Sequence, residues 1–146
     1  IKSFVLERIM TSDCKYGFGT EITLSFDETL SRVETLLKNR GFRIFTRMDL
    51  KEIVEGENIK DIGNYVILGA CNSEFAKELF SADPDIGMLM PCNIVVYEPG
   101  NGMCKVMVKD PVRIMDLINN PLAIHAAMKV KDQMKIIIEE LQEDDI

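Results

Sequence analysis

The chain has 146 residues, of which 47% are hydrophobic and 28% are charged. This balance is typical of one folded globular domain and excludes a disordered chain. Seventeen basic and 24 acidic residues give a net charge of -7, which repels nucleic-acid phosphates and anionic lipid surfaces. We therefore expect neither nucleic acid nor a membrane as a partner.

The first half of the chain predicts a strand, a helix and two further strands. Polar and apolar residues alternate over 20–26, as they do in a half-buried strand. A capping box that begins at Ser25 and the helical spacing that follows predict a helix over 26–40. Residues 42–48 and 65–71 have the composition of strands.

The second half predicts a hairpin between helices. Asn72 or Ser73 can cap a short helix, and the strands 93–98 and 103–109 flank a Pro-Gly-Asn-Gly turn. Asp110 and Asn120 each precede a proline, which predicts the starts of two more helices. The last helix has an apolar stripe that is expected to lie across a sheet. The stripe consists of Ala123, Ala127, Val130, Met134, Ile137 and Leu141.

Two Cys-Asn motifs accompany this β-α-β-β-α-β-β-α order, in Y-V-I-L-G-A-C-N at 65–72 and in I-G-M-L-M-P-C-N-I-V-V-Y-E at 86–98. In this combination the sequence resembles the domain-of-unknown-function family 302 over about residues 16–142. The resemblance implies an α+β fold with a curved, mostly antiparallel sheet of about five strands backed by helices, similar to the TATA-binding-protein-like architecture. It also implies a homodimer, but it supplies no catalytic residues.

The resemblance divides the chain into two parts. Residues 1–15 precede it and are interpreted as an N-terminal extension, and residues 16–146 are interpreted as a single α+β domain. The chain opens with Ile1, which leaves open a leader ahead of it.

The candidate binding or reactive residues are Cys71, Asn72, Cys92 and Asn93, where apolar strands meet polar or turn residues, together with Gly69. Cys71 precedes a predicted helix N-terminus, whose N–H groups and dipole lower the pKa of a thiol. A small buried cysteine, with Asn72 as the helix cap, explains the same position. If their strands are neighbours, Cys71 and Cys92 could border one pocket as soft ligands or as a redox pair. We expect them to lie nearer to each other than to the chain's first cysteine.

Two further patterns concern metals. Met88, Met90 and Cys92 alternate and would share one face of an extended segment, although methionines at such positions are more simply core fillers. His125 is the only histidine, which excludes a His-rich cluster. We therefore predict no metal site, and the cofactor stays unassigned.

The four cysteines show no C-x-x-C spacing, and a domain of this size needs no disulfide for stability, so we expect reduced thiols and a cytoplasmic location. No window reaches the roughly 18 to 20 apolar residues of a membrane span.

No complete catalytic set is present, so we interpret the chain as a non-catalytic dimeric module that binds a small ligand between the sheet and the helices. One alternative is thiol-dependent redox or sulfur-transfer chemistry at Cys71 or Cys92, which requires an accessible thiol of lowered pKa. The other is soft-metal or haem binding through cysteine and methionine, with His125 as an auxiliary ligand.

Overall fold

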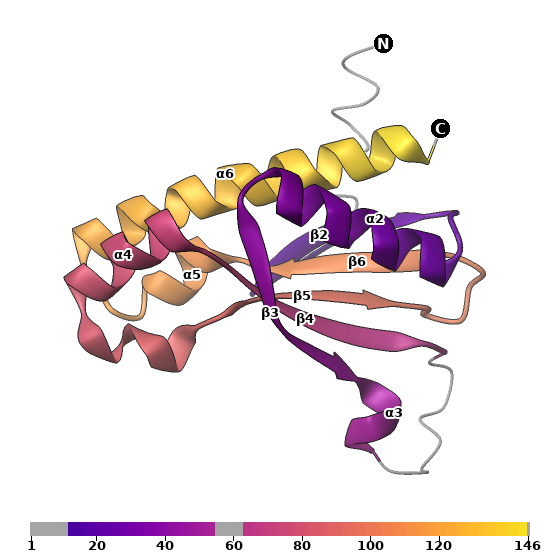
Figure 1. Cartoon of the computed structure of the whole chain (residues 1–146), viewed down its shortest axis with the longest axis horizontal. Coiled ribbons are helices and arrows are strands. Elements are labelled where there is room, and N and C mark those ends of the chain that lie inside the picture. The colour runs from indigo at the N-terminus through magenta and orange to yellow at the C-terminus, as the bar shows by residue number, and fades with distance from the viewer. Residues whose placement is uncertain (1–11, 55–62, 146) are drawn as a thin grey trace.

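The computed structural model describes residues 12–54 and 63–145, whose strands form one antiparallel sheet in the order β1-β2-β6-β5-β4-β3 (Figure 1). The strands are β1 Ser12–Cys14, β2 Gly17–Ile22, β3 Phe42–Asp49, β4 Tyr65–Asn72, β5 Cys92–Tyr97 and β6 Cys104–Lys109. The helices are α2 Phe26–Asn39, α3 Leu50–Ile53, α4 Ser73–Ala82, the 3₁₀ helix η1 Pro84–Leu89, α5 Pro111–Met115 and α6 Pro121–Asp144.

The α+β fold with an antiparallel sheet is confirmed, but the sheet has six strands instead of about five. The additional strand is β1, which pairs with β2 from Ser12 opposite Gly19 to Cys14 opposite Gly17. It lies within the segment interpreted as an extension. β1 is an edge strand that buries neither of its faces. Its three residues therefore lack the alternation of polar and apolar side chains by which a strand is predicted from sequence.

The first long strand also differs from the prediction, since β2 covers 17–22 instead of 20–26. Its two glycines allow close contact with β6: a Cβ atom on Gly19 would lie 1.8 Å from the carbonyl oxygen of Val106. Glycine inside a strand often marks such an approach of two backbones. Residues 23–25 leave the sheet because Ser25 caps α2, accepting from the backbone N–H of Glu28 at 3.2 Å.

The predicted helix starts are confirmed by their capping side chains. Asn72 accepts from the N–H of Glu74 at 3.0 Å at the start of α4. Asp110 and Asn120 cap α5 and α6 in the same way, and the prolines that follow them occupy the first helical turn.

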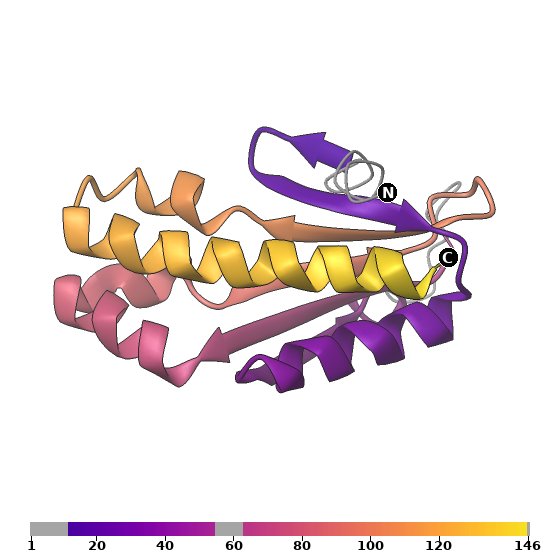
Figure 2. The same cartoon turned by 90° about the horizontal axis from the view of Figure 1, so that it is seen from above.

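The helices α2 and α6 cover one face of the sheet, and α6 runs along the sheet beside α2 (Figure 2). All six residues of the α6 stripe are buried. Along β5 and β6, buried and half-buried residues alternate strictly, from Cys92 to Tyr97 and from Cys104 to Lys109. The sheet therefore has a buried face under the helices and an open face on the other side.

A second apolar cluster lies beyond one end of the sheet. There α4, η1 and α5 pack against the N-terminal part of α6 through Leu79, Ile86, Met115 and three alanines of α6. Both Cys-Asn motifs are at this end of their strands, between the two clusters. None of the helices in the described part of the chain combines the length and the apolar character needed to cross a bilayer.

Candidate functional site

The two Cys-Asn motifs are brought together by neighbouring strands. Ala70 of β4 pairs with Cys92 of β5, so Cys71 is next to this pair in β4 and its side chain alternates to the other face of the sheet. Both cysteines, together with Met90, line a small cavity that we call the sulfur cavity. Its other walls come from Phe42, Asn72, Phe75, Ala76, Leu79, Leu89, Lys109, Pro111, Ala127, Val130 and Ala70.

The sulfur cavity has a volume of about 30 Å³ and an almost entirely apolar lining. That space accepts one or two water-sized groups, whereas pockets for organic ligands measure roughly 300–1,000 Å³. A ligand of ordinary size, or a haem, does not fit this space between the sheet and the helices.

Burial governs the chemistry of both thiols. It raises the pKa of Cys71, and this effect outweighs the backbone N–H of Cys92 and the charge of Lys109, which lower it. Burial also raises the pKa of Cys92 to about 12, again against the charge of Lys109. Of the two interpretations of Cys71, the lowered pKa is wrong, because burial raises it, as the alternative of a small buried cysteine implies.

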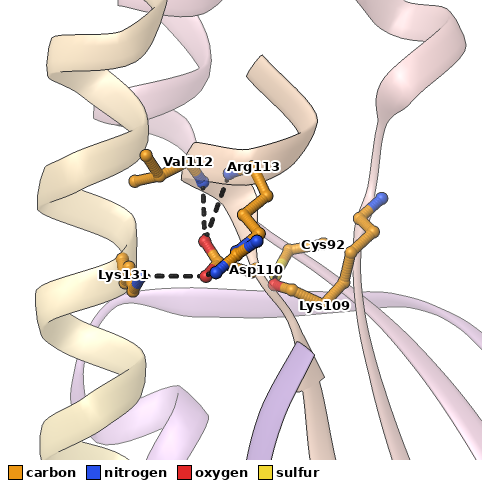
Figure 3. Close-up of polar contacts among 6 residues, drawn as sticks. All are labelled: Cys92, Lys109, Asp110, Val112, Arg113 and Lys131. Carbon is orange, nitrogen blue, oxygen red and sulfur yellow. Dashed lines mark hydrogen bonds and ion pairs between the residues drawn. The ribbon is translucent and has the colours of Figure 1, made fainter. Parts of the chain in front are cut away.

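Lys109 connects the sulfur cavity to the turn before β5. Its ammonium group donates to the carbonyl oxygens of Leu89 at 3.0 Å and Pro91 at 2.8 Å. Its backbone carbonyl accepts a weak hydrogen bond from the Cys92 thiol at 3.9 Å. In Figure 3 the Lys109 side chain extends away from the carboxylate of its neighbour Asp110. Lys109 thus brings a positive charge to an apolar site.

Asp110 belongs to a separate polar cluster. It is buried, it accepts from the N–H groups of Val112 and Arg113 at 3.0 and 3.3 Å, and it pairs with Lys131 of α6 at 2.8 Å (Figure 3). Burial raises the pKa of Asp110, but the hydrogen bonds from Lys131 and the backbone outweigh it, so that the pKa is lowered overall. The sequence predicted the cap and missed the pairing with Lys131, because nothing in one sequence indicates which lysine of α6 faces β6.

The remaining predicted site residues have separate surroundings. Asn72 caps α4 and donates to the carbonyl of Arg40 at 3.4 Å. Gly69 lies beside the bulge in β3, where an added Cβ would come within 2.1 Å of the Thr46 hydroxyl and 2.7 Å of Pro91. Neighbouring side chains therefore explain this glycine. Asn93 lines a hollow on the open face of the sheet.

That hollow, which we call the sheet-face hollow, has a volume of about 380 Å³. The chain's three tyrosines, Tyr16, Tyr65 and Tyr97, all line it. Tyr65 and Tyr97 stack with ring centroids 4.9 Å apart, and the Lys105 ammonium lies 6.0 Å from the Tyr97 ring. Burial raises the pKa of Tyr65, as do the neighbouring Tyr97 and Tyr16.

Sequence reasoning missed the sheet-face hollow. A signal was present, since Tyr65 and Tyr97 alternate with the buried positions of their strands and so belong to the opposite face. The first cysteine, Cys14, also lines this hollow, apart from the cavity that Cys71 and Cys92 share.

The interpretation of both methionines as core fillers is wrong for Met88, which also does not share a face with Met90 and Cys92. Met88 belongs to η1 and is 84% exposed, while Met90 and Cys92 line the sulfur cavity. A 3₁₀ turn does not place alternate residues on one face as a strand does. His125 is exposed on α6, and within the described residues no group of three or more His, Cys, Asp or Glu side chains could hold a metal ion.

Comparison with known proteins supports the resemblance seen in the sequence. A solved structure described as the crystal structure of uncharacterized conserved protein DUF302 from Bacillus stearothermophilus is similar, with a TM-score of 0.79 and 22% identity, over 88% of this chain and 99% of that chain. No curated protein matches the chain. Residues 18–141 match the family model Domain of unknown function DUF302. The chain therefore belongs to the DUF302 family.

Proposed function

We propose that the protein is a non-catalytic module that binds a small molecule with a flat apolar body and an anionic group in the sheet-face hollow. The observation that carries this proposal is the hollow itself, with its three tyrosines and two lysines on the open face of the sheet. Its volume of about 380 Å³ lies within the usual range of ligand pockets, roughly 300–1,000 Å³. The ligand site thus lies on the opposite face from the one that the sequence suggested.

The lining supplies two complementary kinds of contact. The stacked pair Tyr65 and Tyr97, with Val95 and Met107 beside it, offers an apolar surface for a planar group. Lys105 and Lys109 place positive charge at the same surface, which favours an anionic substituent. Asn93 adds an amide that both donates and accepts.

A binding role is preferred over thiol chemistry because of the surroundings of Cys71 and Cys92. Burial raises the pKa of both thiols, so both are protonated near neutral pH and are weak nucleophiles. The four free cysteines support a reducing, cytoplasmic setting as part of the same proposal.

We also propose that the protein forms a homodimer, but through the open face of the sheet and not through the α6 stripe that the sequence suggested. The apolar stripe of α6 is buried within the chain and is therefore not available to a second copy. The open sheet face has half-buried apolar side chains at Ile67, Val95 and Met107, and a second copy over them would enclose the hollow.

Titration with the dye 1-anilinonaphthalene-8-sulfonate tests the ligand proposal, since this dye combines a flat apolar body with one sulfonate. We expect saturable fluorescence enhancement by the native chain, and dissociation constants raised about 5- to 10-fold by Tyr97→Ala and by Lys105→Met. Lys135→Met is the matched control. Lys135 is exposed on α6, which covers the opposite face of the sheet, and it does not line the sheet-face hollow.

The unsulfonated anilinonaphthalene tests the anionic group separately, and it should bind the native chain and Lys105→Met equally. Circular dichroism must show native structure in each variant, because loosely packed states also bind such dyes. Equal affinity of the native chain and both hollow variants for the sulfonated dye would refute the proposal.

A further inference from the structure

β3 is a long strand at the edge of the sheet. Among the described strands it pairs with β4 alone, and it runs from the end of α2 to α3 (Figure 1). It has eight residues, whereas β1 at the opposite edge has three. The outer N–H and C=O groups of an edge strand are a template on which another strand can form.

The residues around this edge are basic, although the whole chain has a net charge of -7. Residues 38–47 contain no acidic residue and four basic ones: Lys38, Arg40, Arg43 and Arg47. Arg40 and Arg47 each pair with a glutamate of a neighbouring helix. No carboxylate in the described part of the chain pairs with Lys38 or Arg43. The edge therefore carries positive charge that the described residues do not neutralise.

A hollow of about 330 Å³, which we call the edge groove, accompanies the strand. Residues of α2 and β3 line it: Glu34, Lys38, Phe42, Arg43, Ile44 and Arg47. Phe45 lies where the pairing of β3 with β4 shifts, and it is 59% exposed. The Arg43 guanidinium lies 5.0 Å from the centre of the Phe45 ring. The edge thus offers an apolar contact next to its cations.

We propose that β3 and the edge groove bind an extended, acidic segment of a partner protein, which adds to the sheet as a further edge strand. Main-chain hydrogen bonds to the edge supply affinity in this mode of recognition, and contacts of alternate side chains supply specificity. The segment brings carboxylates to Lys38 and Arg43, which form charge-assisted hydrogen bonds with them. Arg47 can join them by exchanging Glu34, its partner in a largely exposed ion pair.

The charges of β3 disfavour a second copy of the chain as the occupant. The strand carries Arg43 and Arg47 against a single carboxylate, Asp49, and Asp49 caps α3 by accepting from the N–H of Lys51 at 2.9 Å. Two antiparallel β3 strands would therefore bring an excess of positive charge face to face, which is destabilising. An acidic segment removes this excess.

This site does not depend on the function proposed for the sheet-face hollow. The edge groove and the hollow share no lining residue. Dye binding in the hollow and peptide binding at the edge can therefore succeed or fail separately.

Fluorescence anisotropy tests the proposal on the full chain, with a labelled and capped peptide of sequence Thr-Glu-Val-Glu-Val-Glu-Val-Thr. We expect saturable binding at low ionic strength, and a dissociation constant raised about 5- to 20-fold in the double variant Lys38→Gln/Arg43→Gln. The double variant Lys77→Gln/Lys135→Gln is the matched control. It removes the same charge from exposed lysines of α4 and α6 that do not line the edge groove.

Two further peptides separate strand addition from charge attraction. A peptide with two of its valines replaced by proline keeps every charge but loses backbone N–H groups, and it should bind at least about 10-fold more weakly. A peptide with lysine in place of glutamate should not bind. In hydrogen exchange followed by mass spectrometry, the acidic peptide should protect the amides of β3 and not those of β1.

The proposal is overturned if the acidic peptide does not bind, or if the proline peptide or an oligothymidylate of equal length binds as tightly. It is also overturned if the control variant weakens binding as much as Lys38→Gln/Arg43→Gln. Protection of the β3 amides that grows with protein concentration in the absence of peptide would identify a second copy as the occupant, against the proposal.

Discussion

Cys71 lies directly before α4, where the free N–H groups of a helix favour a thiolate, yet burial raises its pKa. Cys92, one strand away, is buried and has a pKa raised to about 12. Sequence position alone indicated that these residues occur at strand ends next to turns, and this was correct. The balance between dipole and desolvation depends on which side chains cover the thiol, and a single sequence does not contain that information.

The thiols should therefore react in order of exposure. With iodoacetamide at pH 7, we expect Cys14 to be alkylated first because it is exposed, Cys71 more slowly, and Cys92 only after unfolding. A pKa of about 12 leaves roughly one Cys92 thiol in 10⁵ ionised at pH 7. Peptide mass spectrometry over time, with and without urea, measures the three rates. Alkylation of native Cys92 as fast as Cys14 would contradict this prediction.

Asp110 should contribute stability that depends on pH. Because the pKa of Asp110 is lowered on folding, its carboxylate stabilises the fold fully above the unfolded value of about 3.9. That contribution is lost as the pH falls through the folded pKa. We expect Asp110→Asn to lower the free energy of unfolding at pH 7 by about 1 to 3 kcal/mol, since the variant leaves Lys131 without its carboxylate.

Urea unfolding at pH 7 and at pH 3 measures this difference, which should shrink at the lower pH. Asp144→Asn is the control, because the pair of Asp144 with Arg32 is more exposed, with side-chain exposures of 35% and 40%, and should change stability by less than about 1 kcal/mol. An Asp110→Asn effect that is constant over this range would rule out the carboxylate as its source.

At the scale of elements, local signals predicted best. The β5–β6 hairpin, the caps at Ser25, Asn72, Asp110 and Asn120, and the buried stripe of α6 all appear as expected. Each of them depends on residues close in sequence. The strand β2 was placed three residues too late, because its glycines weaken the strand pattern and its position depends on pairing with the distant β6.

The contact between β2 and β6 predicts a large effect of a small substitution. In Gly19→Ala the new Cβ would lie 1.8 Å from the Val106 carbonyl oxygen, and a backbone atom in a sheet cannot move aside without breaking the pairing. We expect the free energy of unfolding to fall by about 2 to 4 kcal/mol, measured by urea denaturation. Gly87→Ala is the control, since its Cβ would meet only the Phe80 ring at 3.5 Å. Equal stability of the two variants would contradict this packing.

At the scale of the whole molecule, the candidate sites could be predicted only in part. The sequence suggested that Cys71 and Cys92 could border one pocket if their strands were neighbours, and β4 and β5 are neighbours. The strand order that satisfies this condition is a long-range property. For the sheet-face hollow, alternation along the strands indicates that Tyr65 and Tyr97 share the open face, but their meeting with Tyr16 and Lys105 depends on the order of the strands.

The proposed homodimer makes a prediction at this scale. Analytical ultracentrifugation over a wide concentration range should show a dimer whose dissociation constant rises at least 10-fold in Met107→Lys, because the new charge would be buried between two open sheet faces. Met128→Lys is the control, since Met128 is 53% exposed on α6. A monomer at every concentration, or disruption by Met128→Lys alone, would exclude this interface.

The position of β2 in the sheet has a consequence for synthesis on the ribosome. β2 joins the sheet through β6, with Gly17 opposite Lys109 and Ile22 opposite Cys104, so this pairing must wait until most of the chain has been made. Until then Phe18 and Ile22, both buried in the finished fold, are without the partners that cover them. A nascent chain that stalls before residue 104 thus presents an apolar strand with an open edge, which is the kind of segment that chaperones bind and that aggregates.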